Sequence, residues 1–244
     1  WRSHWIYNVM LQIELKAGGK VYPVLCVKAS GRTSSVRIKD GKVVLRLSRF
    51  SRGSDMDRVT GKFLKWARKK LEKAGNLESL MPVYGDRGRV CTHNKVYEIN
   101  VFEEDRANFG ARLVNGYLIE IRIPFGQNEK VKFLAEKIII KDQTPYLKQV
   151  LDELNELHFK FKYNLCRFKR TNSRFGSCSR RCNINIAYKT LFMPREVFSY
   201  VCLHELAHLK EMNHSKRFWA LVSEAMPDYK DHEKWLRRNG FALG

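Results

Sequence analysis

The 244-residue sequence predicts an α+β fold with a β-rich N-terminal half packed against a helical C-terminal half that carries the active site. Two patterns predict this class. Residues 1–126 hold strand-like runs of β-branched and aromatic residues separated by Gly-containing turns. Residues 127–244 are dominated by apolar spacings of three and four, which are typical of helices. We therefore predict two regions, 1–126 and 127–244, which can pack as one body.

The N-terminal region begins with strands and continues with one helix. Residues 4–15 and 20–29 are strand-like, and residues 35–48 predict a hairpin that turns at Asp40-Gly41. Ser54 or Asp55 then begins a helix that runs to about Ala74 and is ended by Gly75. Its buried stripe is predicted to be Phe63, Ala67 and Leu71.

The middle of the chain returns to strands and then turns helical. Residues 89–104 and 111–124 predict strands, the second run turning at Asn115-Gly116. After Pro124 and Gly126, residues 129–140 and 146–161 show helical spacing in two segments.

The last third combines two strands with three helices. Residues 164–170 and 183–188 predict strands, separated by a loop rich in Gly, Ser and Arg. Helices are predicted at 193–212, with Pro194 in the first turn, at 215–226, capped by Ser215, and at 229–239.

The charge of the chain points to a polyanionic partner. Lys and Arg number 46 against 25 Asp and Glu, a formal net charge of +21. The charge is concentrated in residues 62–73 and 167–181. Such a surface attracts nucleic acid, anionic lipid or acidic protein, and we predict low-specificity nucleic-acid binding weakened by reversing Arg167, Lys169 and Arg170. The alternative is a solvated surface that only keeps the protein soluble.

The cysteines and the hydropathy of the sequence predict the cellular compartment of the protein. The six cysteines are dispersed, which suits reduced thiols and a cytoplasmic protein better than a disulfide framework. Cys178 and Cys182 are close enough for a second metal site but lack a matching pair. No stretch approaches the ~20 apolar residues of a membrane span, and the first 15 residues lack an apolar signal core.

The segment HELAHLKEMNH, residues 204–214, predicts a metal site. His204 and His208 are four residues apart and therefore lie on one helix face, where both imidazoles can reach one Zn²⁺ ion. Glu205 can reach a water molecule on that ion without binding the ion itself. His214 follows Asn213, whose tolerance of the left-handed conformation would end the helix and return a third ligand.

Other side chains compete for the third position. Glu211, Glu224, Glu233 and His232 are the alternatives, and His214 is favoured because the helix is expected to break just before it. Three protein ligands leave one coordination position open, which distinguishes a catalytic zinc from a structural one. We therefore predict one zinc per chain and hydrolysis by a zinc-activated water, with Glu205 as general base. Other divalent metals also fit a three-His site.

Longer patterns around the motif resemble the YgjP-like metallopeptidase family, whose members are predicted metal-dependent hydrolases. The resemblance rests on an RxxGSCS-like loop, on P-x-x-V-x-x-Y-V-x-x-H-E-L-A-H and on N-H-S-x-x-F-W, over residues 174–236. The hairpin at 34–48 and the basic helix after it are also similar to that family. Phe175 stands where the family usually carries Trp.

The resemblance implies a zincin-like catalytic half with His204, His208 and His214 on zinc and Glu205 as the catalytic glutamate. It also implies similarity to the SprT and WLM groups, some of which cut proteins crosslinked to DNA. In zincin folds an edge strand pairs with an extended substrate, and residues 183–188 are predicted to be that strand. Ile184 and Ile186 would face the core, with Asn183 and Asn185 on the other, substrate-facing side. An ordinary amphipathic strand would show the same alternation.

Three functions remain open from the sequence. The first is a zinc-dependent metallopeptidase that acts on protein or peptide substrates, near nucleic acid. The second is a metal-dependent hydrolase of a nucleotide or other phosphate ester, although such enzymes often use two metals and carboxylate-rich sites. The third is a nucleic-acid-binding module with a structural zinc, for which Cys202 is a poor fourth ligand because it lies on another helix face.

Overall fold

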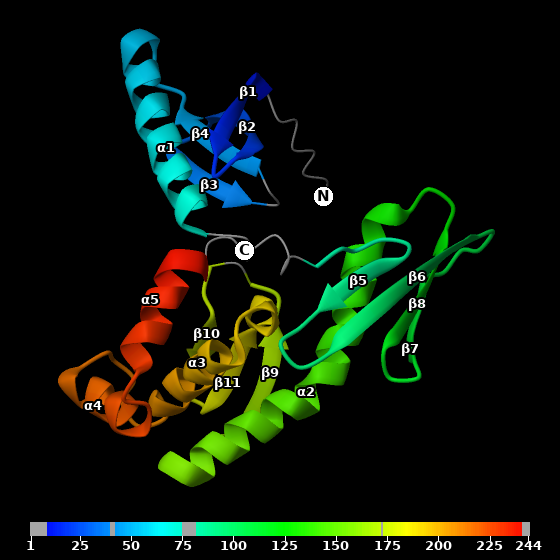
Figure 1. Ribbon diagram of the computed structural model, residues 1–244, viewed down its shortest axis with the longest axis vertical. Helices are drawn as coiled ribbons and strands as arrows, with labels where there is room; N and C mark the ends of the chain where they lie inside the picture. The colour runs from blue at the N-terminus through cyan, green and yellow to red at the C-terminus, as the bar shows by residue number, and fades with distance from the viewer. Residues whose placement is uncertain (1–8, 40–41, 75–81, 172, 241–244) are drawn as a thin grey trace. The chain divides into compact units, whose positions relative to one another are not determined.

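The computed structural model describes residues 9–39, 42–74, 82–171 and 173–240, which form two compact units (Figure 1). The first unit is built mainly from residues up to Leu77, and the second runs from Glu78 to Leu236. The sheet formed by residues 88–124 therefore belongs to the second unit. The sequence-based division after residue 126 stays a prediction.

The first unit is a four-stranded sheet with one helix. Its strands are β1 (Val9–Ala17), β2 (Lys20–Ala29), β3 (Ser35–Lys39) and β4 (Lys42–Ser48), in the order β1-β2-β4-β3. Strands β2 and β4 are parallel and the other pairs antiparallel. Lys39 pairs with Lys42, as a hairpin requires, while the predicted turn at 40–41 lies outside the described residues.

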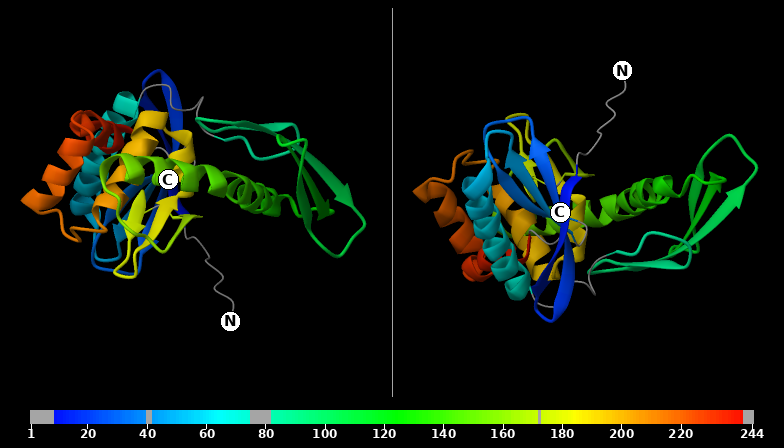
Figure 2. Two further views of the ribbon diagram at one scale, coloured as in Figure 1. Left: turned by 90° about the horizontal axis from the view of Figure 1, so that it is seen from below. Right: turned by 90° about the horizontal axis from the view of Figure 1, so that it is seen from above.

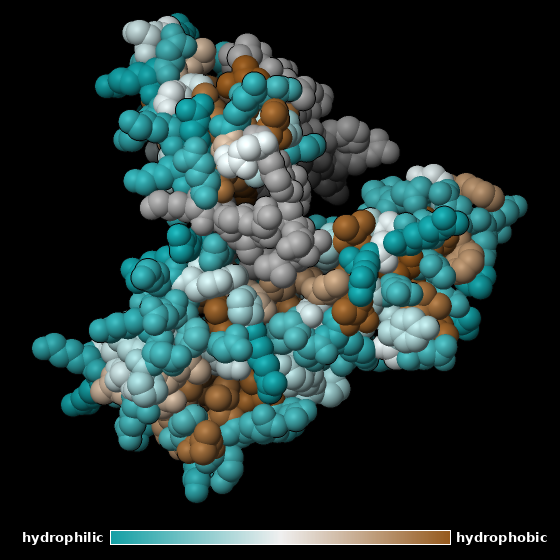
Figure 3. All heavy atoms as spheres, in the orientation of Figure 1, coloured by the Kyte–Doolittle hydropathy of each residue, from teal (hydrophilic) through white to brown (hydrophobic). Residues whose placement is uncertain are grey.

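Helix α1 (Gly53–Ala74) packs an apolar stripe on this sheet and exposes a basic face. Ala67 is fully buried, and the predicted Phe63 and Leu71 pack beside it against the core. The predicted helix end at Gly75 lies outside the described residues. The basic stretch 62–73 exposes Lys62, Lys65, Arg68 and Lys69, and α1 shows a mostly hydrophilic surface (Figure 3).

The second unit begins with another four-stranded sheet. It consists of β5 (Gly88–Cys91), β6 (Val96–Glu104), β7 (Gly110–Val114) and β8 (Leu118–Pro124), in the order β5-β6-β8-β7. Asn115 and Gly116 have φ of 49° and 79°, so the predicted turn is confirmed. Ile119, Ile121 and Ile123 alternate along β8 and are fully buried.

One long helix connects this sheet to the rest of the unit. A short 3-10 turn, η2 (Asn128–Lys130), leads into α2 (Val131–His158), which contacts β7 and β8 as well as β9 and α3 (Figures 1 and 2). The sequence predicts two helical segments here, but α2 continues through Pro145. A proline removes one main-chain hydrogen bond, and the buried side chains of α2 on both sides of it keep the helix together.

The remaining strands form a three-stranded sheet that supports the metal motif. They are β9 (Leu165–Lys169), β10 (Gly176–Cys178) and β11 (Asn183–Ala187), in the order β10-β11-β9. Strand β10 lies inside the segment predicted to be a loop. Ile184 and Ile186 of β11 are fully buried, as predicted from their alternation.

Three helices follow, and all but the last three of their residues belong to the second unit. A 3-10 segment, η3 (Tyr188–Phe192), precedes α3 (Arg195–Ala207), followed by α4 (Lys216–Ala225) and α5 (Tyr229–Asn239). Helix α3 is buried along most of its length and ends earlier than the predicted residue 212. The mixed α and β composition confirms the predicted fold class. No helix among the described residues is long and apolar enough to cross a bilayer.

Candidate metal centre

Three histidine rings meet at the end of α3. One ring nitrogen from each of His204, His208 and His214 lies within 4.8 Å of the others, and the Nε2 atoms of His204 and His214 are 2.9 Å apart. In the part of the chain that the structure describes, this is the one group of three or more metal-ligating side chains. The structure thus brings together the three histidines that the sequence singled out.

The C-terminal end of α3 orients the second histidine. The helix ends at Ala207, and His208 is its C-cap. Nδ1 of His208 lies 2.9 Å from the main-chain oxygen of Glu211. With Nδ1 donating to that carbonyl, Nε2 is left with its lone pair for a metal ion. The prediction that Asn213 ends the helix in the left-handed conformation is wrong, because Asn213 has no positive φ and the helix ends six residues before it.

The start of α4 places the third histidine. Ser215 caps α4 by accepting a hydrogen bond from the main-chain N–H of Phe218 (3.3 Å), which confirms its predicted role. Its own N–H donates to the oxygen of Asn213 (2.7 Å), so the chain on both sides of His214 is fixed. The sequence N-H-S therefore places a ligand immediately before a capped helix.

An aromatic floor supports all three rings. Phe218 is fully buried, and its ring centroid lies 4.5–4.8 Å from those of His204, His208 and His214. Trp219 stacks on His214 with centroids 5.8 Å apart. These contacts restrict each imidazole and explain the F-W of the longer motif.

Burial favours neutral imidazoles at this site. Burial lowers the pKa of His204 to about 3, with repulsion from His208 and His214 adding to the effect. Burial also lowers the pKa of His208. A neutral imidazole keeps the lone pair that binds a metal ion, so the protonation states suit metal binding near neutral pH.

Glu205 lies on the same helix, one residue after His204. Its side chain is 5% exposed, and its Oε2 atom is buried without a hydrogen-bond partner among the described residues. Burial raises the pKa of Glu205 to about 8, opposed by the nearby Arg174 and by a hydrogen bond from the Cys178 main-chain N–H. A buried polar atom without a partner is costly, and Oε2 is one of five such side-chain atoms among the described residues.

Gly176 is a site residue that the sequence reasoning did not single out. It lies in β10 against Glu205, and a Cβ atom placed on it would lie 2.4 Å from Oε1 and 2.6 Å from Cγ of that carboxylate. Its place in the RxxGSCS-like loop was the sequence feature that could have identified it. The Lys189 Nζ atom lies 4.6 Å from the ring centroid of the neighbouring Phe175. Phe175 therefore supplies an aromatic ring at the position where the family usually has Trp.

The predicted position of the substrate strand is wrong. Strand β11 lies between β10 and β9, so neither of its edges is open to a further strand. Asn185 is 8% exposed, accepts a hydrogen bond from Arg167 Nε (3.0 Å) and donates to Ser177 Oγ (3.3 Å). Asn183 Oδ1 is buried. The alternation of the segment reflects burial on both faces of a central strand rather than an edge strand.

The other candidate ligands lie outside the histidine group. Glu211 contributes its main-chain oxygen, and His232 pairs with Asp228 at 3.3 Å. The carboxylates of Glu224 and Glu233 are not part of the group. Among the described residues, Cys178 and Cys182 do not belong to a set of three ligands, and Cys202 is fully buried.

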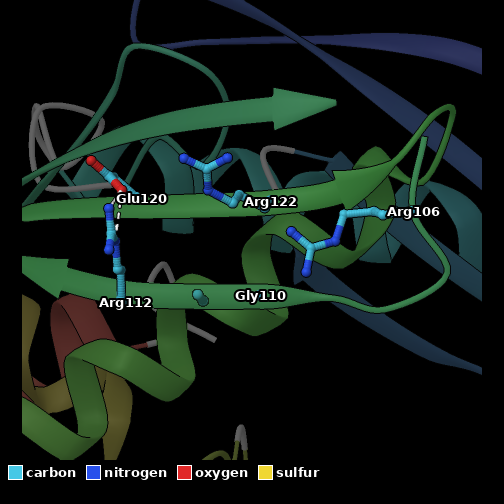
Figure 4. A pocket seen from close by; sticks show the side chains of 6 residues that line it. Arg106, Gly110, Arg112, Glu120 and Arg122 are labelled. Atoms are coloured by element: carbon cyan, nitrogen blue, oxygen red, sulfur yellow. Dashed lines mark hydrogen bonds and ion pairs between the residues drawn. The ribbon is translucent and has the colours of Figure 1, made fainter. Parts of the chain in front are cut away.

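A pocket on β7 and β8 is lined mainly by charged residues. It has a volume of about 380 Å³ and is lined by three arginines, with Arg112 pointing to Glu120 and Arg106 over Gly110 (Figure 4). Arg112 pairs with Glu120 at 2.7 Å, and Arg106 and Arg122 both pair with Glu104. The pairs of Arg112 with Glu120 and of Arg122 with Glu104 join neighbouring strands, which stabilises the sheet.

The sequence matches the model of one known protein family. A sequence model of the YgjP-like family, described as a metallopeptidase domain, matches residues 32–239. No curated protein is detectably similar in sequence.

Two solved structures align with part of the chain. The zymogen of the metallopeptidase abylysin from Pyrococcus abyssi shares 24% identity, covering 38% of this chain and 97% of that one, with a TM-score of 0.34. The zymogen of jannalysin from Methanocaldococcus jannaschii shares 19% identity, covering 37% and 93%, with a TM-score of 0.33.

Proposed function

The chain belongs to the YgjP-like metallopeptidase family, and on this basis we propose that it is a zinc-dependent peptidase with Glu205 as the general base. The observation that carries the proposal is the meeting of three imidazoles beside a buried carboxylate oxygen that has no partner among the described residues. We assign His204, His208 and His214 as the ligands of one Zn²⁺ ion per chain.

The donor set fits a catalytic zinc. Three histidine ligands leave one coordination position open, whereas structural zinc sites usually have four Cys or His ligands. A bound zinc ion lowers the pKa of a water molecule and polarises a carbonyl group. The described residues hold one such group without carboxylates, which favours a peptidase over a two-metal phosphate-ester hydrolase or a module with structural zinc.

The surroundings of Glu205 support its proposed role in proton transfer. Glu205 follows His204 on α3, and its carboxylate rests against Gly176 of β10. From there it takes a proton from the attacking water and delivers it to the amine that leaves. The hydrogen bond from the Cys178 N–H fixes the carboxylate without occupying Oε2.

The open edge of β10 is our replacement for the predicted substrate strand. Ala187 N donates to Phe175 O (2.7 Å) and Ser179 N donates to Asn183 O (3.0 Å), so residues 175 and 179 pair with β11. By alternation, Gly176 and Cys178 direct their main-chain groups away from β11, and because the Cys178 N–H donates to Glu205, the Gly176 groups and the Cys178 carbonyl are left for a further strand. An extended peptide that pairs with this edge would place its scissile bond beside Glu205.

The test is a comparison of wild-type protein with Glu205→Gln. We expect one zinc per chain in both proteins by elemental analysis, and hydrolysis of an unfolded protein substrate by the wild type alone. Glu224→Gln, an exposed carboxylate change on α4, is the matched control and should retain activity. Turnover by Glu205→Gln, or wild-type protein without stoichiometric metal, would contradict the proposal.

A further inference from the structure

A basic groove lies between α2 and β9, outside the histidine group. It has a volume of about 480 Å³ and is lined by residues of which four are cationic, namely Lys137 from α2 and Arg167, Lys169 and Arg170 from β9 and the residue after it. Ile140 and Phe168 complete the lining. The sequence pointed to residues 167–181 as a basic stretch. The structure adds Lys137 from a distant segment and leaves Arg180 and Arg181 outside the groove.

The charges in this groove are poorly compensated. None of its lining residues is acidic, and among the described residues one carboxylate, Glu136, pairs with a lining cation, Arg170, at 3.6 Å. The pocket of Figure 4 is the contrast, because there each arginine pairs with Glu104 or Glu120. Four cations with one carboxylate partner leave a field that attracts an anion.

Two of the four side chains are held in place. Arg167 donates its Nε–H to Asn185 Oδ1 at 3.0 Å, which fixes the guanidinium and leaves its two terminal nitrogens for another acceptor. Arg170 lies over the Phe133 ring at 4.2 Å from its centroid. A fixed guanidinium loses less conformational entropy when it binds a phosphate, so the groove is prepared for such a ligand.

The arrangement suits a chain of phosphates rather than one. Arg167 and Lys169 are two residues apart on a strand, so they lie on the same side about 6.7 Å apart. Lys137 adds a further cation from α2. Phe133 is 47% exposed although Arg170 covers one face of its ring, so the other face is the one on which a base can stack. Cations from two elements, α2 and β9, suit several phosphates of one chain better than a single phosphate.

We propose that the groove between α2 and β9 binds single-stranded nucleic acid through its phosphate backbone, without sequence preference. Strand β9 is on the opposite edge of the three-stranded sheet from β10, about 10 Å away at the usual strand spacing. A strand bound there leaves the β10 edge accessible to a polypeptide. The inference goes beyond the proposed peptidase activity and does not depend on zinc or on Glu205.

The test measures binding of a fluorescently labelled 20-nucleotide oligothymidylate by anisotropy between 50 and 200 mM KCl. Each phosphate contact on a single strand contributes about −0.7 to the slope of log K against log salt, so four contacts give a slope of about −3. Lys137→Glu with Lys169→Glu should weaken binding at least ~10-fold at 50 mM salt and flatten the slope by about 1.4. Lys137→Gln with Lys169→Gln should weaken it to an intermediate extent.

A matched control separates the groove from general charge. Lys230→Glu with Lys234→Glu on α5 changes the net charge equally at two exposed positions outside the groove, and binding should stay within about threefold of wild type. Glu205→Gln should bind like wild type, so loss of hydrolysis is distinguishable from loss of nucleic-acid binding. Three results would overturn the proposal. The first is no wild-type binding at 50 mM salt, and the second is an equal loss of binding in the groove variant Lys137→Glu with Lys169→Glu and in the control variant Lys230→Glu with Lys234→Glu. The third is groove-dependent binding that is stronger to phosphatidylserine vesicles than to the oligonucleotide.

Discussion

The carboxylate of Glu205 rests on the main chain of Gly176, with no room for a side chain between them. A Cβ atom at residue 176 would lie 2.4 Å from Oε1, 2.6 Å from Cγ and 2.7 Å from Cδ of Glu205. Contacts this short do not occur between a real Cβ and its neighbours, so any other residue would displace the carboxylate or the strand. The position of the proposed base thus depends on a residue 29 positions away in the sequence.

Gly176→Ala should therefore reduce activity and leave metal binding intact. The methyl group would displace the Glu205 carboxylate by an ångström or so, and misplacement of this size costs roughly 100-fold in rate. Among the described residues, no hydrogen bond or ring contact joins Gly176 to the three histidines, so the zinc content should be unchanged. The measurements are peptidase rate and elemental analysis on the same preparation. Gly85→Ala is the control, because nothing lies within 4 Å of its Cβ position. Full activity in Gly176→Ala would show that the carboxylate needs no such space.

His214→Ala should weaken metal binding far more than Glu224→Ala or Glu233→Ala. The His214 ring nitrogen lies 2.9 Å from that of His204, while neither glutamate belongs to the histidine group. Loss of outer hydrogen-bond partners already costs 10–100-fold in metal affinity, so loss of a ligand should cost at least ~100-fold. Competition with a chelator of known affinity measures the effect. If a glutamate variant loses more metal than His214→Ala, the third ligand is a carboxylate.

Ser215→Ala should lower the free energy of unfolding by about 1 kcal/mol. Ser215 accepts the hydrogen bond from Phe218 N–H at the start of α4, and alanine leaves that donor without its partner. Urea denaturation of the metal-free protein measures the change. Ser223→Ala, on the same helix but bonded only to the Ala220 oxygen, should change it less. Ser215→Asp should restore most of the stability because aspartate also caps helices.

His93 should make the second unit less stable in acid. Burial lowers the pKa of His93 from 6.5 to about 4, and its Nε2 lies 3.1 Å from the Tyr146 hydroxyl. Between pH 6.5 and pH 4, His93 binds a proton more readily in the unfolded chain than in the folded one. The contribution of neutral His93 to the free energy of unfolding is therefore present above pH 6.5 and is lost as the pH falls toward 4.

The test is the difference in unfolding free energy between pH 7 and pH 5. For wild type, His93 should contribute a loss on the order of 1–2 kcal/mol, with allowance for partial exposure. His93→Gln should remove that part of the loss, whereas His158→Gln, an exposed change at the end of α2, should not. An equal pH dependence in wild type and His93→Gln would contradict the assignment.

Local signals predicted the helices and the ligand group well. The bounds of α5 agree with the predicted 229–239, and α4 begins after its predicted cap because Ser215 meets the requirement for an N-cap locally. The three histidines are brought together by one turn of helix and one short return of the chain. Features set by residues within about ten positions of one another were therefore accessible from the sequence.

Features that depend on contacts between distant parts of the chain could not be predicted from the sequence. Strand β10 consists of Gly, Ser and Cys, which have no β preference, and it is formed by pairing with β11. The central position of β11 depends on the order of the strands, which alternation does not encode. Pro145 suggested a break that burial on both sides of α2 prevents. The apposition of Gly176 and Glu205, and of Lys137 and Lys169, exists only in three dimensions.

The continuity of α2 has a consequence for how the length of this chain can change in evolution. The helix contacts β7 and β8 as well as β9 and α3. Each inserted residue would rotate everything beyond it by about 100° and shift it by about 1.5 Å, turning buried positions outward. Insertions and deletions between Ile139 and Leu147 should therefore be rare, because even seven residues, which restore the rotation, shift everything beyond them by about 10 Å. The segment 105–109 between β6 and β7 carries no such phase requirement, and length variation among related chains should concentrate there.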